Sequence, residues 1–230
     1  DGSQSNPYKT VSASRLGTNN HFKPGTYTLT SGITTSIFSS NAVSSFSGED
    51  MEKTIIRFTG TDNFLSTSSD VSFSKITLIG ANIVSTGGTI TATDTIFDSG
   101  VAKEETESDN YKYGNSYGGA IKQAITSSSS IDWGDIFGGG SSSSAGMTFN
   151  NCVFKNNYAA YGGAIYAEKG TVTITNSRFE KNHADNGGGA IAALNSVKLT
   201  ITDCVFEDDY SSYDAGGAVY LFNVTSASIK

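Results

Sequence analysis

The side chains that could carry chemistry are mostly carboxylates, and they fall into three groups. The groups are Glu104, Glu105, Glu107 and Asp109; Asp132 and Asp135; and Glu207, Asp208, Asp209 and Asp214. Paired carboxylates catalyse glycoside hydrolysis, and clustered carboxylate oxygens bind Ca²⁺. All three groups lie in predicted turns or insertions, and the chain has no EF-hand or nonapeptide calcium repeat. We therefore predict solvated acidic loops, with a Ca²⁺ site and a catalytic pair as the alternatives.

Other arrangements that could support catalysis are weaker. The two histidines, His21 and His183, each lack a second histidine at metal-ligand spacing, and His183 lies in a predicted turn beside Asn182. No Gly-x-Ser-x-Gly nucleophile elbow with a plausible histidine partner stands out. We predict that the chain is not an enzyme and has no catalytic, cofactor-binding or metal-binding residue, with Ca²⁺ the one cofactor left open.

Aromatic side chains are the stronger candidates for recognition. Tyrosines are concentrated in the predicted turns, at Tyr111, Tyr113, Tyr117, Tyr158, Tyr161, Tyr210 and Tyr213. Tyrosine combines a large apolar surface with a hydroxyl group, which suits contact with protein or sugar. The candidate ligand-contact residues are Tyr111, Tyr113, Tyr117 and Trp133. The alternative is that the tyrosines stack on one another within the turns.

The elements that must position these residues are short strands in a repeat. Three similar blocks, 150–166, 175–192 and 202–220, each contain Phe-x-x-Asn/Asp followed by Gly-Gly-Ala-Ile/Val. The phenylalanines of these blocks are 25 and 27 residues apart. Between the motifs, in 171–175 and 198–202, apolar residues occupy every second position, which predicts strands rather than helices. Short strands recurring at this period predict one solenoid coil per repeat.

Equivalent residues of successive coils should lie on top of one another, about 4.8 Å apart. The repeat residues are Phe154, Asn157, Gly162 and Gly163; Phe179, Asn182, Gly188 and Gly189; and Phe206, Asp209, Gly216 and Gly217. The phenylalanines should form one inward stack, and the asparagines should form a ladder of amide hydrogen bonds. The glycine pairs should supply a positive φ or a close backbone approach where the chain bends.

We predict an all-β chain folded as a right-handed parallel β-helix, a single-stranded solenoid with an N-terminal cap and loop insertions. One domain covers residues 1–230, with a cap region at 1–30, shorter coils at 31–100 and the Gly-Gly-Ala-Ile coils at 101–230. An insertion at about 126–146 breaks the period and should leave the coil as a lateral excursion, because its apolar centre needs a packing partner.

The repeat register argues against a disulfide. Cys152 and Cys204 each lie two residues before a repeat phenylalanine, and Ser177 occupies the same position in the coil between them. Two coil rises of about 4.8 Å would separate the two cysteine Cα atoms by roughly 9.6 Å. A disulfide requires less than about 7 Å. We therefore predict that both thiols are free.

The paired Phe-x-x-Asn and Gly-Gly-Ala-Ile motifs of residues 90–230 resemble the repeats of chlamydial polymorphic outer-membrane proteins and of adhesin-like β-helix proteins of other microbes. Asp209 and Val219 depart from that pattern, which has asparagine and isoleucine. The resemblance implies a non-enzymatic surface module that binds through its loops and lateral face and acts as a rigid stalk. A polysaccharide lyase or glycoside hydrolase is the alternative, since fold does not fix function.

Composition limits the partners. A net charge of −7 disfavours binding to nucleic acid, and no run of 18 apolar residues predicts a transmembrane segment. Abundant glycine, serine and threonine with only 16% charged residues is typical of extracellular all-β proteins. We expect a secreted or cell-surface piece of a longer protein, associated with an outer membrane or cell wall. Its expected partner is a protein or glycan on a host or neighbouring cell.

Overall fold

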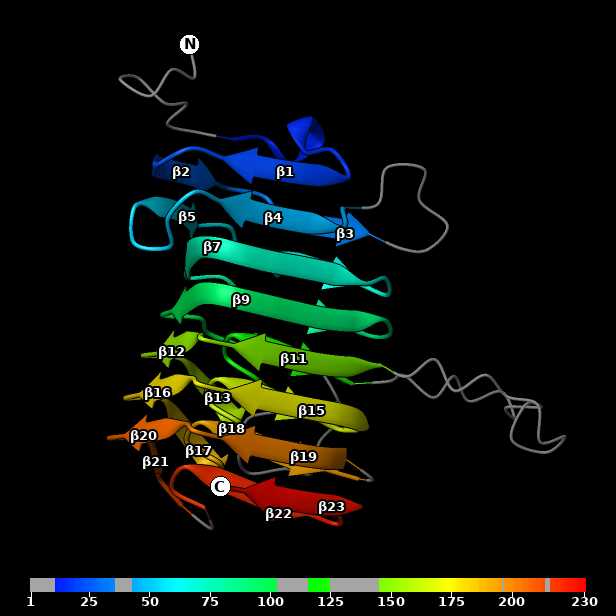
Figure 1. The fold of residues 1–230 in the computed structure, drawn as a ribbon, viewed down its shortest axis with the longest axis vertical. Helices are drawn as coiled ribbons and strands as arrows, with labels where there is room; N and C mark the ends of the chain where they lie inside the picture. The colour runs from blue at the N-terminus through cyan, green and yellow to red at the C-terminus, as the bar shows by residue number, and fades with distance from the viewer. Residues whose placement is uncertain (1–10, 36–42, 103–115, 125–144, 196, 214–215) are drawn as a thin grey trace, which may run out of the picture.

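The computed structural model describes residues 11–35, 43–102, 116–124, 145–195, 197–213 and 216–230. These residues form a right-handed parallel β-helix, as predicted, with the coils stacked along one axis from the N-terminal to the C-terminal end (Figure 1). Every strand pair within the described residues is parallel. The only helix among them is a 3-10 turn, η1, at Ala13–Arg15.

The broadest wall of the solenoid is one long parallel sheet. Its main path runs through β1 (Asn19–Phe22), β4 (Ser45–Gly48), β7 (Val71–Ile79), β9 (Thr89–Asp98), β11 (Gly146–Asn150), β15 (Gly170–Thr175), β19 (Val197–Thr202) and β23 (Ser226–Ile229). Shorter strands continue the same sheet around the corner: β2 (Gly25–Leu29), β5 (Thr54–Phe58), β12 (Val153–Lys155), β16 (Arg178–Glu180) and β20 (Val205–Glu207). Apolar and polar residues alternate along these strands, so the apolar side chains all lie on the face that points into the core.

Two further sheets close each coil. One contains β3 (Ile33–Thr35), β6 (Leu65–Thr67), β8 (Ile83–Ser85), β10 (Ile121–Gln123), β14 (Ile165–Ala167), β18 (Ile191–Leu194) and β22 (Val219–Phe222). The other contains β13 (Tyr158–Tyr161), β17 (His183–Gly187) and β21 (Tyr210–Ser211). Within the part of the chain that the structure describes, the third sheet is confined to the later coils, where it forms a lateral face.

The corners of the coils depend on residues that tolerate a left-handed backbone. Between the two parts of the long sheet, Asp94, Asn151, Asn176 and Asp203 have φ values of 49 to 54°. Asparagine and aspartate adopt this conformation more readily than other residues with a side chain. In the Gly162–Gly163 pair, the first glycine supplies the positive φ and the second allows the close backbone approach. Gly162 has φ of 62°, and a Cβ on Gly163 would lie 2.1 Å from the Gly189 carbonyl oxygen.

The core contains the expected phenylalanine stack and extends it by one coil. Phe97, Phe154, Phe179 and Phe206 lie one above another, with ring centroids 4.8, 4.9 and 4.7 Å apart and ring planes within 8° of parallel. The first three are fully buried, whereas Phe206 is half-buried because it lies in the last coil of the stack. Burial of each ring stabilises the fold by about 1.5–3 kcal/mol.

The aliphatic pairs follow the predicted register. Val172 pairs with Leu199 and Ile174 pairs with Ile201, and all four side chains are buried. The stacks are therefore continuous from coil to coil.

Part of the segment expected as the N-terminal cap, residues 1–30, forms strands. Strands β1 and β2 pair with β4 and β5 and so belong to the first coil. Capping comes from the residues just before them: Val11, Ala13 and Leu16 pack against the core above this coil. A strand edge covered in this way is shielded from pairing with another chain.

Several predicted features lie outside the described residues. These are the contact residues Tyr111, Tyr113 and Trp133, the carboxylates at 104–109, 132, 135 and 214, and the insertion at 126–146 except for its last two residues. Those two, Ala145 and Gly146, are buried, and Gly146 begins β11. The long sheet therefore resumes in register directly after the insertion.

Candidate functional site

A row of aromatic rings runs along the third sheet, one from each successive coil. Tyr158 pairs with His183, and His183 pairs with Tyr210, in strands β13, β17 and β21. The His183 ring lies 5.2 Å from the Tyr158 ring and 4.1 Å from the Tyr210 ring, nearly parallel to the latter. We call these three residues the aromatic ladder. His183 is therefore in a strand rather than in the predicted turn, and Tyr158 and Tyr210 are 37% and 53% exposed.

Polar atoms line one edge of the aromatic ladder. The Tyr158 hydroxyl donates to Asp185 Oδ2 over 2.7 Å. His183 Nε2 lies 2.7 Å from the Ser212 hydroxyl and 3.8 Å from Asp185 Oδ1. Asp185 therefore joins two rungs of the aromatic ladder, and it fixes the orientation of the Tyr158 ring.

A second aromatic group lies where the third sheet meets the β10–β14–β18–β22 sheet. The Tyr117 ring is 6.0 Å from the Tyr161 ring and 4.7 Å from the Tyr166 ring, and Tyr161 lies 6.4 Å from Tyr220. The Lys122 ammonium group sits 4.8 Å from the centre of the Tyr117 ring, within the range of a cation–π contact. We call these four tyrosines and Lys122 the corner cluster.

The two groups provide apolar surface with hydroxyl groups on the later coils. Rings of the aromatic ladder stack on one another along the solenoid axis, so their edges and polar atoms, more than their faces, meet solvent. Tyr213, in the same coil as Tyr210, is 66% exposed. Surfaces rich in partly exposed tyrosine are typical of recognition sites. Tyr158 and Tyr210 stack on His183 and stay partly exposed, whereas Tyr166 of the corner cluster is buried.

The described carboxylates of the third acidic group do not converge. Glu207 forms an ion pair with Arg178, which also contacts Glu180. Asp208 is exposed at a corner with φ of 57°. Asp209 points inward, where its Oδ1 accepts from the side chain of Asn182 over 2.8 Å. Within the described ranges, no three histidine, cysteine or acidic residues come together in a way that could hold a metal ion.

The remaining candidates for catalysis lie in separate places. His21 is in the first coil, where its Nδ1 lies 3.0 Å from the Ser47 hydroxyl. The Gly114–Gly118 segment has the Gly-x-Ser-x-Gly spacing of a nucleophile elbow. Its Ser116 is buried, and its hydroxyl oxygen accepts the Ala160 N–H over 2.8 Å. This hydroxyl thus holds two neighbouring coils together.

Sequence reasoning missed Asp185, Tyr166, Tyr220 and Lys122. A signal for Tyr166 and Tyr220 was present, because each directly follows a Gly-Gly-Ala-Ile/Val motif. Register alone would have placed both on the outward side of the same sheet. No comparable signal identifies Asp185, which becomes important only because a neighbouring coil brings Tyr158 next to it.

Comparison with known proteins supports the architecture. Residues 136–230 match the family model described as a right handed beta helix region. No curated protein and no solved structure matched the chain. Within the described residues, no helix is long and apolar enough to cross a membrane.

The fold and the family match define the chain as a right-handed parallel β-helix protein. The match identifies the architecture without naming an adhesin family. The resemblance to chlamydial polymorphic outer-membrane proteins therefore contributes only to the proposal that follows.

Proposed function

We propose that this chain is a non-enzymatic binding module of a secreted or cell-surface protein, which acts as a rigid stalk and contacts a protein or glycan through its lateral face. The observation that carries the proposal is the aromatic ladder together with the corner cluster on the later coils. Apart from Tyr117, which forms an isolated parallel bridge to Tyr161, the residues of both groups lie on strands, which hold binding residues more rigidly than loops. Preorganised side chains lose little conformational entropy on binding.

The resemblance to adhesin-like repeat proteins supports the same proposal. Coils joined by continuous stacks of buried residues resist bending, which suits a spacer between a cell and its partner. A partner on a host or neighbouring cell could also contact the segments predicted as loops at 101–117 and 126–146. The alternative, a carbohydrate-active enzyme on the same fold, predicts cleavage rather than binding alone.

The test is a binding assay on intact microbial and animal cells and on a glycan array, with a fluorescently labelled chain. The double variant Tyr158→Ser/Tyr210→Ser removes the outer rungs of the aromatic ladder and should weaken binding at least tenfold, because central aromatic side chains dominate interface energies. Val205→Ser is the matched control, since Val205 is an exposed apolar residue of the last coil on a different sheet and should leave binding unchanged.

Two results would contradict the proposal. Equal binding by the double variant and the parent chain would show that the partner does not contact the aromatic ladder. New reducing ends or unsaturated products from acidic or neutral polysaccharides would identify an enzyme instead.

A further inference from the structure

A ladder of polar side chains lies inside the corner that follows the phenylalanine stack. Its positions, which we call the ladder slot, are Gly100, Asn157, Asn182 and Asp209, each three residues after a stacked phenylalanine. The backbone N–H of each of the first three positions donates to the side-chain Oδ1 in the next coil. Gly100 donates to Asn157 over 2.8 Å, Asn157 to Asn182 over 3.1 Å, and Asn182 to Asp209 over 2.8 Å. The Oδ1 atom of every rung is therefore an acceptor for the coil before it.

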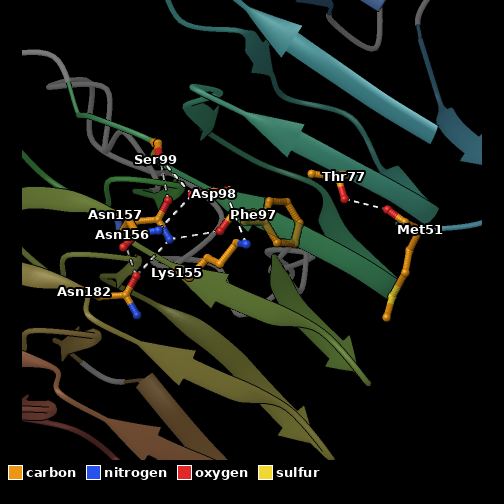
Figure 2. A network of polar contacts seen from close by, with 10 residues as sticks. Met51, Thr77, Phe97, Asp98, Ser99, Lys155, Asn156, Asn157 and Asn182 are labelled. Atoms are coloured by element: carbon orange, nitrogen blue, oxygen red, sulfur yellow. Dashed lines mark hydrogen bonds and ion pairs between the residues drawn. The ribbon is translucent and has the colours of Figure 1, made fainter. Parts of the chain in front are cut away.

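The second side-chain atom of each asparagine is a donor to the coil before it. Asn157 Nδ2 donates to the Phe97 carbonyl oxygen over 3.2 Å, and Asn182 Nδ2 donates to the Phe154 carbonyl oxygen over 3.0 Å. Figure 2 shows the Asn157 amide between Phe97 and Asn182. An asparagine thus satisfies both requirements of the slot, one acceptor and one donor.

Asp209 satisfies only the first requirement. Its Oδ1 accepts from Asn182 N–H and Nδ2, as an asparagine oxygen would. Its Oδ2 takes the place of the amide nitrogen, and this atom is buried with no hydrogen-bond partner among the described residues. By coil equivalence, the group that it faces is the Phe179 carbonyl oxygen, another acceptor. An ionised carboxylate has no proton to donate, so two acceptors would oppose each other in a buried place.

The charges around the ladder slot do not relieve this conflict. Glu207 and Asp208 in the same coil are both acidic, and in the preceding coil Lys181 is exposed while His183 stacks in the aromatic ladder. Burial raises the pKa of Asp209 above its ordinary value, and the negative charge of Asp208 raises it further. Hydrogen bonds from Asn182 and from the backbone of Glu207 oppose this rise in pKa but are outweighed by burial.

We propose that the folded last coil holds Asp209 as the neutral acid, whose Oδ2–H donates to the Phe179 carbonyl oxygen as the asparagine amides do in the coils above. On ionisation, the proton leaves Oδ2 for solvent, this hydrogen bond is lost, and residues 203–213 dock less tightly. The structure thus assigns a proton-dependent latch to the coil that carries Tyr210. The latch is independent of the proposed binding function and would stand if no ligand bound the aromatic ladder.

The direction of the pH effect follows from the raised pKa. At a pH below about 4 the group is protonated in both the folded and the unfolded chain, and its contribution to stability is fully present. As the pH rises, the unfolded chain ionises first. The contribution is therefore lost progressively until the pH has passed the higher pKa of the folded chain.

The decisive comparison is Asp209→Asn against Asp208→Asn in the 230-residue chain. The Asp209→Asn substitution restores the missing donor and should dock the last coil more tightly. The reporter is the backbone N–H of Tyr210, which donates to the Asn182 carbonyl oxygen. At pH 7.5 this N–H should exchange with deuterium about tenfold more slowly in the variant than in the parent chain. At pH 4 the difference should shrink towards zero. Asp208→Asn removes a neighbouring charge that also raises the pKa of Asp209, but it leaves the slot without a donor, so its gain at pH 7.5 should be much smaller than that of Asp209→Asn.

A second measurement keeps the proposal testable without any substitution. The carboxyl ¹³C resonance of Asp209 in the parent chain should titrate at a pH above the ordinary aspartate range. An Asp209 resonance that titrates at or below the ordinary aspartate range would overturn the proposal. So would faster exchange at Tyr210 in Asp209→Asn at neutral pH, because a charged carboxylate would then be the better occupant of the slot.

Discussion

Cys152 and Cys204 occupy equivalent positions two coils apart. Ser177 lies between them, and its hydroxyl accepts the Cys152 N–H over 3.1 Å. Both cysteines are free in the structure; Cys152 is buried and Cys204 is half-buried. Each sulfur also contacts the carbonyl oxygen two residues before it, at 3.4 and 3.3 Å. The thiols therefore behave as small fillers beside the phenylalanine stack.

The difference in burial predicts a difference in reactivity. Burial raises the pKa of Cys152 to about 12 and also raises the pKa of Cys204. Because the thiolate is the reactive form, Cys204 should react first with a chromogenic thiol reagent at pH 8, and Cys152 should react only on unfolding. In denaturant without reductant, the reagent should titrate two free thiols per chain. No free thiol in a chain of monomeric mass would contradict the coil register.

At Gly163 two neighbouring coils approach so closely that there is no room for a Cβ atom. An added Cβ would lie 2.1 Å from the Gly189 carbonyl oxygen and 2.5 Å from the His183 carbonyl oxygen, both parts of the next coil's backbone. Gly163→Ala should therefore lower the free energy of unfolding by about 1–3 kcal/mol or more. Gly17→Ala is the control, because nothing lies within 4 Å of its added Cβ and the change should stay within about 0.5 kcal/mol. Urea unfolding measures both variants, and an equal loss of unfolding free energy in Gly163→Ala and Gly17→Ala would contradict the close approach of the two coils.

At the scale of elements, strands gain stability from the coils above and below them. Phe179 in β16 has a ring on each side, whereas Phe206 in β20 has one only on the Phe179 side. We expect Phe179→Ala to lower the free energy of unfolding by about 3–5 kcal/mol and Phe206→Ala to cost clearly less. Chemical denaturation of both variants measures this. Equal losses would mean that stacking across coils contributes little beyond the burial of each ring.

At the scale of the whole fold, the described residues form a column of repeated coils, and the first and the final coil present different surfaces. The N-terminal end is covered by Val11, Ala13 and Leu16. At the other end, the last coil exposes Phe222 and Ile229, at 56% and 57%. Stability in such a column is close to a sum of coil and interface contributions, so each coil depends most on its immediate neighbours. A local change in the last coil, such as loss of the Asp209 proton, should therefore act mainly on that coil.

The sequence by itself determined the repeat, the inward residues and the register of the later coils. Phe-x-x-Asn and Gly-Gly-Ala-Ile recur at intervals that place Phe154 on Phe179 and Val172 on Leu199, and both pairs are present. This succeeded because each coil repeats the same local pattern, so that one alignment fixes every contact between neighbouring coils. The early motifs are weaker, and no such alignment was available to show that β1 and β2 pair with β4 and β5.

Only the tertiary structure decided how polar side chains from different coils meet. The contact of Tyr158 with Asp185 and the buried position of Asp209 join residues about 25 positions apart in sequence. Spacing can predict that such residues lie in adjacent coils, but the side-chain direction at a corner depends on local φ and on the atoms already present there. Asp209 illustrates this: in the sequence it belongs to an acidic turn, whereas in the fold it occupies a slot built for an amide, between two coils that require both an acceptor and a donor.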